Sequence, residues 1–345
     1  MAQNNKQKKR FMSRLFEQGA PDELDGLTDA WLLTGRGGGN RLNEKQVSDC
    51  ELMDDQWLWL HLDYSKAAVQ EWMYRYSGLN ELTVEALLQV ETRPRCVAMD
   101  NGLLIFLRGV NLNPGADPED MVSLRIWIDN QKIYTLGLRR LLSLDDLRGL
   151  IERGSGPEVP GDFLVMLVNL LLDRVNVVID DLYDLVDQLE ESVLIASGHH
   201  SREQLAGIRR QAITLRRFLA PQREALNRLS AERSAILSNE HHLYLRESSD
   251  RLTRFVEDLD AARERAGVVH ESLVSSLTEQ TNNRMYILSV IAAIFLPLSF
   301  VTGLLGINVG GIPGAESPLG FPLVIFGMLL VAAALLAFFR WRRWF

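Results

Sequence analysis

The residues best suited to chemistry lie in one short segment, 303–314, which reads GLLGINVGGIPG. It contains five glycines and Asn308 and has no charged side chain. An asparagine amide and the carbonyls of a glycine-rich turn are neutral oxygen ligands, which can hold a hard cation or its water shell and still release it. The segment could therefore form a cation entrance. It could equally be an ordinary turn between two helices, where Gly, Pro and Asn are favoured.

Two uncharged apolar runs flank this segment. The run 285–306 has 22 residues and the run 321–339 has 19, and neither contains Asp, Glu, Lys, Arg or His. At about 1.5 Å per helical residue, each run can cross a hydrocarbon core of about 30 Å. Arg284 precedes the first run, and the second is followed by Arg340, Arg342 and Arg343. The positive-inside rule therefore predicts two transmembrane helices with both termini cytoplasmic and the glycine-rich loop outside.

The charge of the chain is unevenly distributed. The net charge is −8, but residues 285–345 carry +2 and the other residues about −10. An acidic soluble part fits attraction of cations and argues against a nucleic-acid partner. Cys50 and Cys96 fit a reducing compartment and form no metal-site spacing. Because the sequence shows no phosphate-binding loop, nucleophile elbow or paired metal-ligand motif, we predict neither an enzyme nor a cofactor.

One face of the first apolar run is mostly small or polar. Steps of three and four residues along this face, which we call the polar stripe, meet Asn282, Met285, Ser289, Ala292, Leu296, Ser299 and Gly303. Small residues are the usual contact surface between helices in bilayers, so close helix packing is one interpretation. The other is a conduction pathway, because the stripe continues toward the N-terminus as Thr278, Ser275 and Glu271. Two spans cannot enclose such a pathway, so it requires a symmetric homo-oligomer.

Three further residues bear on a pathway. Met285 and Leu296 are apolar within the polar stripe, and we hypothesise that they form constrictions. Glu316 is the only acid in the outer loop, 307–320. Copies of it around an entrance would raise the local cation concentration, although a solvated loop carboxylate is the simpler interpretation. Neither span contains an ionisable side chain, so proton-driven transport would have to use the loop, the cytoplasmic part or co-permeation.

The sequence begins with a basic tail at 1–20, which we expect to be disordered. Residues 21–161 predict an α/β domain with a substantially antiparallel sheet. The segment 56–64 is typical of a buried strand, and two hairpins are expected to turn at 100–102 and at 129–130. No apolar stretch follows the tail, so we expect no signal peptide.

Helix start and stop signals add short helices to this domain. One is expected over 66–76 after a Ser65 cap, and another begins at Ser143, which forms a capping pair with Asp146, and ends at Gly154.

Residues 162–284 predict cytoplasmic helices. Apolar residues recur at a helical spacing from Val175 to Val193, and the apolar run 163–172 contains Asn169, so we interpret it as a buried core helix. A second helix begins near Ser201 and is expected to be interrupted or kinked at Pro221. From about His241 no break signal precedes the first span except Gly267, which predicts one long stalk helix.

Two groups of polar residues could bind metal in the cytosol. An acidic face, most simply a solvated one, is formed by Asp180, Asp181, Asp184, Asp187, Glu190 and Glu191. The histidine pairs 199–200 and 241–242 are adjacent in sequence and point about 100° apart on a helix, so neither makes a chelating site. We interpret the two pairs as surface histidines that bind no metal. We interpret His61 and His270 as ordinary histidines as well.

The order of these features resembles the CorA metal ion transporter family. The resemblance rests on two C-terminal spans, a long stalk helix, an acidic α/β domain and a Gly-x-Asn motif, here Gly306, Ile307 and Asn308. The family motif is usually Gly-Met-Asn, and the following VGGIPG replaces residues common in magnesium members. This variant is similar to the ZntB branch, which is associated with zinc. The architectural likeness covers most of the chain.

The resemblance implies an α+β cytoplasmic domain, a stalk helix and two transmembrane helices in a funnel-shaped homopentamer. The first span (285–306) would line the pore, the second (321–339) would lead to a cytoplasmic end at 340–345, and Asn308 would bind the ion through its amide oxygen or hydration shell. We therefore predict transport of divalent cations, zinc first, across a bacterial inner membrane. A CorA-type magnesium or broad divalent channel and a membrane-tethered metal sensor or scaffold are the alternatives.

Overall fold

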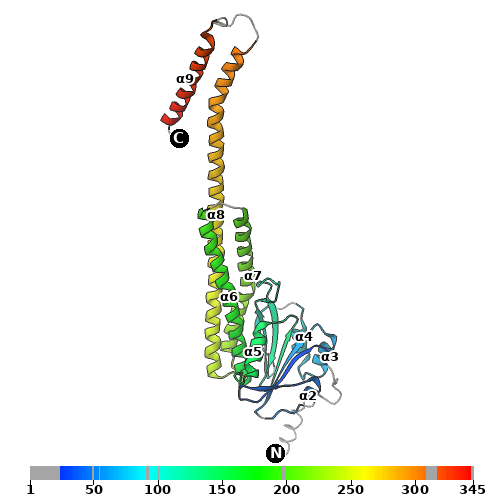
Figure 1. Ribbon diagram of the computed structural model, residues 1–345. Helices are drawn as coiled ribbons and strands as arrows, with labels where there is room; N and C mark the ends of the chain where they lie inside the picture. Colours follow the sequence, from blue (N-terminus) through cyan, green and yellow to red (C-terminus); the bar gives the residue numbers. More distant parts are fainter. Residues whose placement is uncertain are drawn as a thin grey trace, which may run out of the picture. The chain divides into compact units, whose positions relative to one another are not determined.

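The computed structural model describes residues 24–48, 50–53, 55–90, 93–99, 101–195, 199–307 and 317–342 (Figure 1). The chain divides into two compact units, Met1–His270 and Glu271–Phe345. The predicted basic tail at 1–20 lies outside the described residues.

A seven-stranded mixed sheet forms the centre of the first unit. Its strands, in chain order, are β1 (Leu27–Leu33), β2 (Gly39–Arg41), β3 (Trp57–Asp63), β4 (Arg95–Met99), β5 (Gly102–Gly109), β6 (Val122–Ile128) and β7 (Lys132–Gly137). Their order across the sheet is β2-β1-β3-β7-β6-β5-β4. Every neighbouring pair is antiparallel except β3 and β7, which are parallel.

Both predicted hairpins are confirmed. Met99 pairs with Gly102 where β4 meets β5, and β6 and β7 are joined through 129–131. In the second turn the Asp129 carboxylate accepts hydrogen bonds from the backbone N–H groups of Gln131 (2.7 Å) and Lys132 (2.6 Å). An aspartate that bonds the backbone two and three residues ahead is a usual way to close a tight turn.

β3 is buried on both faces of the sheet. Leu58, Leu60 and Leu62 are at most 1% exposed and pack in a core with the short helices α3 (Ala67–Arg75) and α4 (Glu81–Leu88). On the other face Trp59 meets the Phe163 ring edge-on at 5.1 Å. Burial on both sides explains why this strand is a continuous apolar run without polar alternation.

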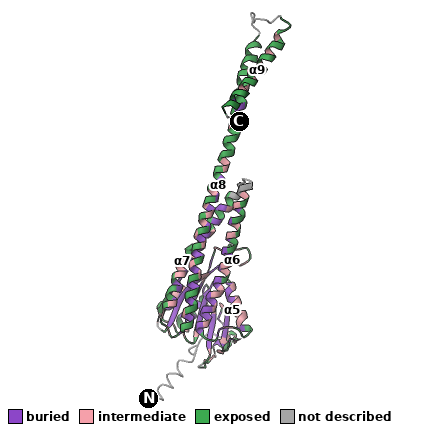
Figure 2. Ribbon diagram, turned by 90° about the vertical axis from the view of Figure 1, so that its left-hand side faces the viewer, coloured by how far each residue is buried: buried purple, intermediate pink, exposed green. Residues whose placement is uncertain are grey.

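Long helices cover the second face of the sheet. α6 (Pro160–Ile195) and α7 (His199–Ala231) contact the sheet, and α5 (Leu142–Glu152) packs on α6. The first part of α8 (Asn239–Leu305) contacts α6 through Arg251 and Asp173 and α7 through Ser249 and Asn227. α2 (Glu44–Ser48) is a short helix beside β1. The apolar run 163–172 lies inside this layer as a buried helix segment, as expected. Figure 2 shows the buried residues gathered in the sheet and along the helices that pack beside it.

The N-termini of α6 and α8 are joined by one polar contact. His241 Nδ1 accepts a hydrogen bond from the backbone N–H of Ser238 (3.0 Å), so the ring proton is on Nε2 and is donated to Asp162 Oδ1 (2.8 Å). Asp162 Oδ2 also accepts from the N–H of Val159 at the start of α6. His241 is 7% exposed, so its interpretation as a surface histidine was wrong.

Three other expectations were also wrong. Ser65 does not cap α3; its backbone N–H and hydroxyl both donate to Asp63 Oδ1. Ser143 lies inside α5 and donates to the carbonyl of Leu170, while Asp146 pairs with Arg174. The interruption expected at Pro221 does not occur, because α7 continues through it to Ala231, and the alternative of a kink stays a prediction. A tertiary partner outcompeted the local capping pattern at Ser143, whereas Ser65 bonds a residue two positions earlier in the chain, and nothing in the structure explains the course of α7.

We predict that Gly161→Ala destabilises the protein. An added Cβ would lie 2.8 Å from the carbonyl oxygen of Ile236 and closer still to the His241 ring. Overpacking of this kind costs about 1–3 kcal/mol, which should lower the thermal unfolding midpoint of the full-length protein.

Gly207→Ala in α7 is the matched control. Nothing lies within 4 Å of the place that an added Cβ would occupy there, so alanine should raise the helix stability by about 0.5–1 kcal/mol. Equal midpoints for Gly161→Ala and the unsubstituted protein would contradict the close contact.

Candidate functional site

The second unit contains the two apolar segments expected to cross a membrane. The C-terminal part of α8 and the whole of α9 (Gly320–Trp341) are long and apolar enough for this. Large apolar side chains such as Phe295 (64% exposed) and Phe326 (67%) are open to the surroundings. In water such exposure would be unfavourable, whereas in lipid it is the expected state.

Within the two spans, burial is restricted to one face of each helix. On α8 the less exposed residues of the span recur every four positions at Tyr286, Val290, Ile294 and Leu298. On α9 they recur at Gly320, Val324, Met328, Ala332, Leu335 and Phe339. Val290 and Phe339 are the most buried, each 6% exposed. The four-residue period indicates a single contact face on each helix.

The polar stripe lies outside this contact face. All seven of its residues are exposed, including Met285 at 58% and Leu296 at 69%. α9 therefore does not cover the stripe within one chain. This placement brings the seven residues onto one open helix face, as their spacing predicted, and is compatible with both contact between copies and a pathway.

The stripe offers neutral oxygen atoms. The Ser289 hydroxyl donates its proton to the carbonyl of Met285 (2.8 Å), which leaves its oxygen lone pairs directed away from the helix backbone. Thr278, which continues the stripe toward the N-terminus, donates in the same way to Val274 (2.8 Å). Hydroxyl oxygens held like this can accept hydrogen bonds from the water shell of a cation.

Only part of the Gly-x-Asn motif is described. α8 ends at Leu305, and the N–H of Gly306 closes the last turn on the carbonyl of Thr302 (2.9 Å). Ile307 follows and is 50% exposed. Asn308 and Glu316 lie outside the described residues, and their proposed roles remain predictions.

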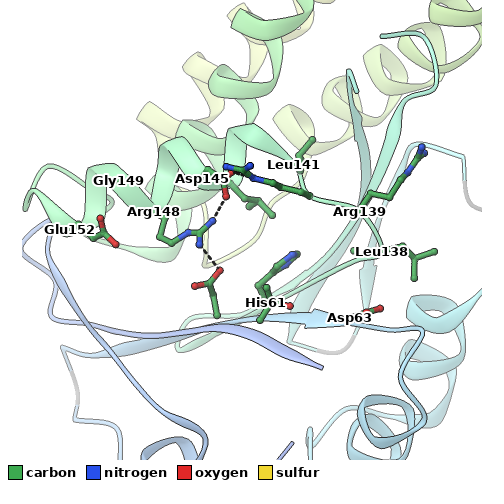
Figure 3. A pocket seen from close by; sticks show the side chains of 14 residues that line it. His61, Asp63, Leu138, Arg139, Leu141, Asp145, Arg148, Gly149 and Glu152 are labelled. Atoms are coloured by element: carbon green, nitrogen blue, oxygen red, sulfur yellow. Dashed lines mark hydrogen bonds and ion pairs between the residues drawn. The ribbon is translucent and has the colours of Figure 1, made fainter. Parts of the chain in front are cut away.

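The first unit contains a separate cavity of about 660 Å³ (Figure 3). It lies at the carboxyl ends of the parallel strands β3 and β7 and beside α5, and several of its charged lining residues form ion pairs. Arg148 pairs with Asp145 and with Asp29 (3.3 Å), and Arg140 pairs with Asp145 (2.6 Å). Desolvation raises the pKa of Asp29, although Arg148 and Arg41 oppose this shift. These arginines are neutralised by their own neighbours.

His61 lies on β3 at the edge of this cavity. The Thr135 hydroxyl donates to the carbonyl of Leu60 (3.2 Å), so His61 Nδ1 donates its proton to Thr135 Oγ1 (3.0 Å) and Nε2 is the acceptor nitrogen. Burial lowers the pKa of His61 to about 4, and nearby Arg148 adds to the shift. His61 is therefore a neutral imidazole at physiological pH.

The candidate cytosolic metal ligands do not gather into a site. In the part of the chain that the structure describes, no three His, Cys, Asp or Glu side chains are placed to hold a metal ion. The side chains of His199 and His200 lie outside that part. The acidic face of α6 is partly neutralised by α8, because Arg265 contacts Asp187 (2.6 Å) and Glu190 (2.7 Å).

Sequence reasoning missed this pairing. Arg251 contacts Asp173 (2.7 Å) on α6, and Arg265 follows Arg251 by fourteen residues on the same face of α8. The placement of these two arginines on one face of α8 was the signal that could have identified a partner helix for the acidic face.

Comparison with known proteins identifies the family to which this architecture belongs. A family model described as CorA-like Mg²⁺ transporter protein matches residues 54–343. The chain belongs to the CorA family. It is 41% identical to the divalent cation transporter CmaX of Pseudomonas aeruginosa over 321 residues, which are 92% of this chain and 97% of CmaX. It is 36% identical to the zinc transport protein ZntB of Pectobacterium carotovorum over 296 residues, 86% of this chain and 89% of ZntB.

Solved structures of this family share the fold. The full-length CmaX structure matches with a TM-score of 0.82 at 41% identity and covers 95% of this chain and 100% of its own. The CorA magnesium transporter of Methanocaldococcus jannaschii matches with a TM-score of 0.75 at 20% identity, covering 90% of this chain and 97% of its own. The expected soluble α/β domain, long helix and two C-terminal apolar helices are thereby confirmed.

We predict that His61 makes the protein less stable in mild acid. Its pKa is 6.5 when unfolded and about 4 when folded. As the pH falls from 6.5 to about 4, the unfolded state takes up a proton that the folded state does not. The free energy of unfolding should fall over this range by at most about 3 kcal/mol.

Comparison with His61→Gln isolates this contribution, because glutamine does not titrate and the surrounding carboxylates are unchanged. Chemical unfolding of both proteins across this pH range should show the stability difference between them shifting in favour of the variant as the pH falls. Parallel pH profiles would show that His61 is not the responsible group.

Proposed function

We propose that this protein conducts divalent metal cations across a membrane along a pathway lined by the polar stripe of α8. The observation that supports this most directly is that all seven stripe residues are uncharged and left uncovered by α9. A stripe of hydroxyl, amide and small side chains offers a hydrated cation neutral oxygens and room for its water shell. The names of the relatives CmaX and ZntB favour the same activity.

The pathway requires several copies of the chain. Two spans cannot surround a column of water, whereas a ring of identical subunits places one stripe from each around a common axis. Membership of the CorA family favours a homopentamer with the first span innermost. The Asn308 amides, with Gly306 and Ile307, would then form a ring of neutral oxygens at the outer entrance, and Glu316 would attract cations to it.

We propose zinc as the first substrate. Ile307 occupies the position where the family motif usually has methionine, and several relatives are named zinc transport proteins. Uptake driven by a proton gradient is part of this proposal. Magnesium is the alternative, which the description of the family model favours.

The membrane topology follows from charge. Arg284 precedes the first span, and Arg340 and Arg342 end the second, while the connection between the spans has no Lys or Arg. The positive-inside rule places these arginines, and both termini, on the cytoplasmic side of a bacterial inner membrane.

Asn308→Ala should abolish cation uptake while leaving assembly intact. The expected reason is that alanine removes the side-chain oxygen from every subunit of the entrance ring at once. The measurement is zinc and magnesium uptake into liposomes containing the full-length protein, with and without an inward proton gradient. Asn176→Ala, an asparagine on α6 in the first unit, is the matched control and should transport normally.

Each outcome of this measurement has a defined meaning. If the unsubstituted protein and the control take up zinc and Asn308→Ala does not, the result supports the entrance ring and zinc as the substrate. If the unsubstituted protein takes up magnesium instead, magnesium is the substrate. Transport that survives the substitution would contradict the role of Asn308. If correctly assembled protein moves neither ion, the chain is better explained as a membrane-tethered metal sensor.

Met285→Ser and Leu296→Ser should each increase cation leak. Both side chains are large apolar members of the polar stripe, and replacing them with small hydroxyls would widen and wet a constriction. Leak is measured as cation uptake into the same liposomes without a proton gradient. Ile287→Ser, on another face of α8 and 51% exposed, is the control. Unchanged leak in both stripe variants would remove these residues as constrictions.

A further inference from the structure

The end of α9 combines aromatic and basic residues. Trp341 is 77% exposed and Phe338 is 47% exposed at the C-terminal end of the helix. The guanidinium of Arg342 lies 5.8 Å from the Trp341 ring centre and 6.0 Å from that of Phe338. Such cation–π contacts hold the guanidinium by its face and leave its N–H edge available to another partner.

The arginines near this end have no carboxylate partner in the described residues. Arg284, Arg340 and Arg342 are exposed, and none is in an ion pair. The described part of the second unit contains two acids, Glu271 and Glu279, and neither pairs with them. Within the described residues these three positive charges are therefore uncompensated, in contrast to Arg148 and Arg265 in the first unit.

The helix register places the three arginines at one end of the two spans. Val290 on α8 and Phe339 on α9 are the two deeply buried residues of the spans. Arg284 precedes Val290 by less than two turns, and Arg340 and Arg342 follow Phe339 directly. Since the two spans are antiparallel, all three lie at the boundary where the apolar surface ends.

We propose that this aromatic and basic end binds the phosphate groups of anionic phospholipids. Exposed tryptophan is typical of the headgroup region of a membrane, and arginine binds phosphate through two parallel N–H donors. Anionic lipids of the cytoplasmic leaflet supply the missing negative charge. The proposal requires the membrane topology given above but is independent of which ion is transported.

The test measures which lipids remain bound to the full-length protein. Protein taken from an equal mixture of phosphatidylglycerol and phosphatidylcholine should retain phosphatidylglycerol preferentially, as counted by native mass spectrometry. An arginine near an anionic surface contributes about 1 kcal/mol, so Arg340→Gln with Arg342→Gln should lower the preference by about fivefold for each arginine. Lysine at both positions keeps the charge and should retain most of the preference.

Arg209→Gln with Arg210→Gln is the matched control, since these adjacent arginines of α7 are also exposed and lie in the first unit. Their substitution should leave the preference unchanged. Salt should release phosphatidylglycerol from the unsubstituted protein, because exposed charges are screened.

Three results would overturn the proposal. They are an equal retention of both lipids by the unsubstituted protein, a preference that survives in the Arg340→Gln and Arg342→Gln protein, and a preference insensitive to salt. The first would also be expected if an acidic segment of another copy occupies the arginines. Lipid retention is read without any ion flux, so failure here is separable from failure of the transport proposal.

Discussion

α8 can bury only one face of its membrane segment within a single chain. The contact face around Val290 is used for packing, and the polar stripe is left open. A bilayer provides no hydrophobic force that would drive a second helix onto this stripe, and lipid tails offer its hydroxyls and amides no hydrogen bonds. Water or the small residues of another copy would satisfy the polar groups of the stripe better than lipid does. Both arrangements involve an assembly, so the open face of α8 favours oligomerisation.

The elements of the soluble domain could be predicted where the signal was local. The two hairpins follow from turn residues at 100–102 and 129–130, and the buried helix 163–172 follows from a short apolar run with Asn169 inside it. Strand pairing could not be predicted, because it depends on residues far apart. β3 and β7 are parallel neighbours and bring His61 and Thr135 together across 74 positions. β1 was missed because Asp29 interrupts its apolar pattern.

Polar residues were hardest to interpret from the sequence. Ser65 and Ser143 fit capping patterns, but Ser65 bonds Asp63 two positions earlier in the chain and Ser143 bonds the distant carbonyl of Leu170. His241 was expected on the surface, but in the fold it is buried and its ring donates a hydrogen bond to Asp162, 79 positions away. The polar stripe was different, since it depends only on the period of one helix. Spacing alone placed its seven residues on one face, whereas Asn308 and Glu316 lie beyond what the structure describes.

The chemistry of the described stripe limits how an ion could be selected. Protein sites that bind zinc tightly use cysteine or histidine, with thiolate sulfur or imidazole nitrogen as direct ligands. The described stripe offers hydroxyl and amide oxygens with Met285 as its one sulfur. Weak neutral oxygens favour an ion that keeps its water shell, and a hydrated zinc ion and a hydrated magnesium ion carry the same charge. Discrimination between them must then depend on how far the shell is stripped at the narrowest point. If the stripe lines the proposed pathway, selection between the two ions would fall to the entrance around Ile307 and to the constriction hypothesised at Leu296, and the rest of the stripe would conduct both ions alike.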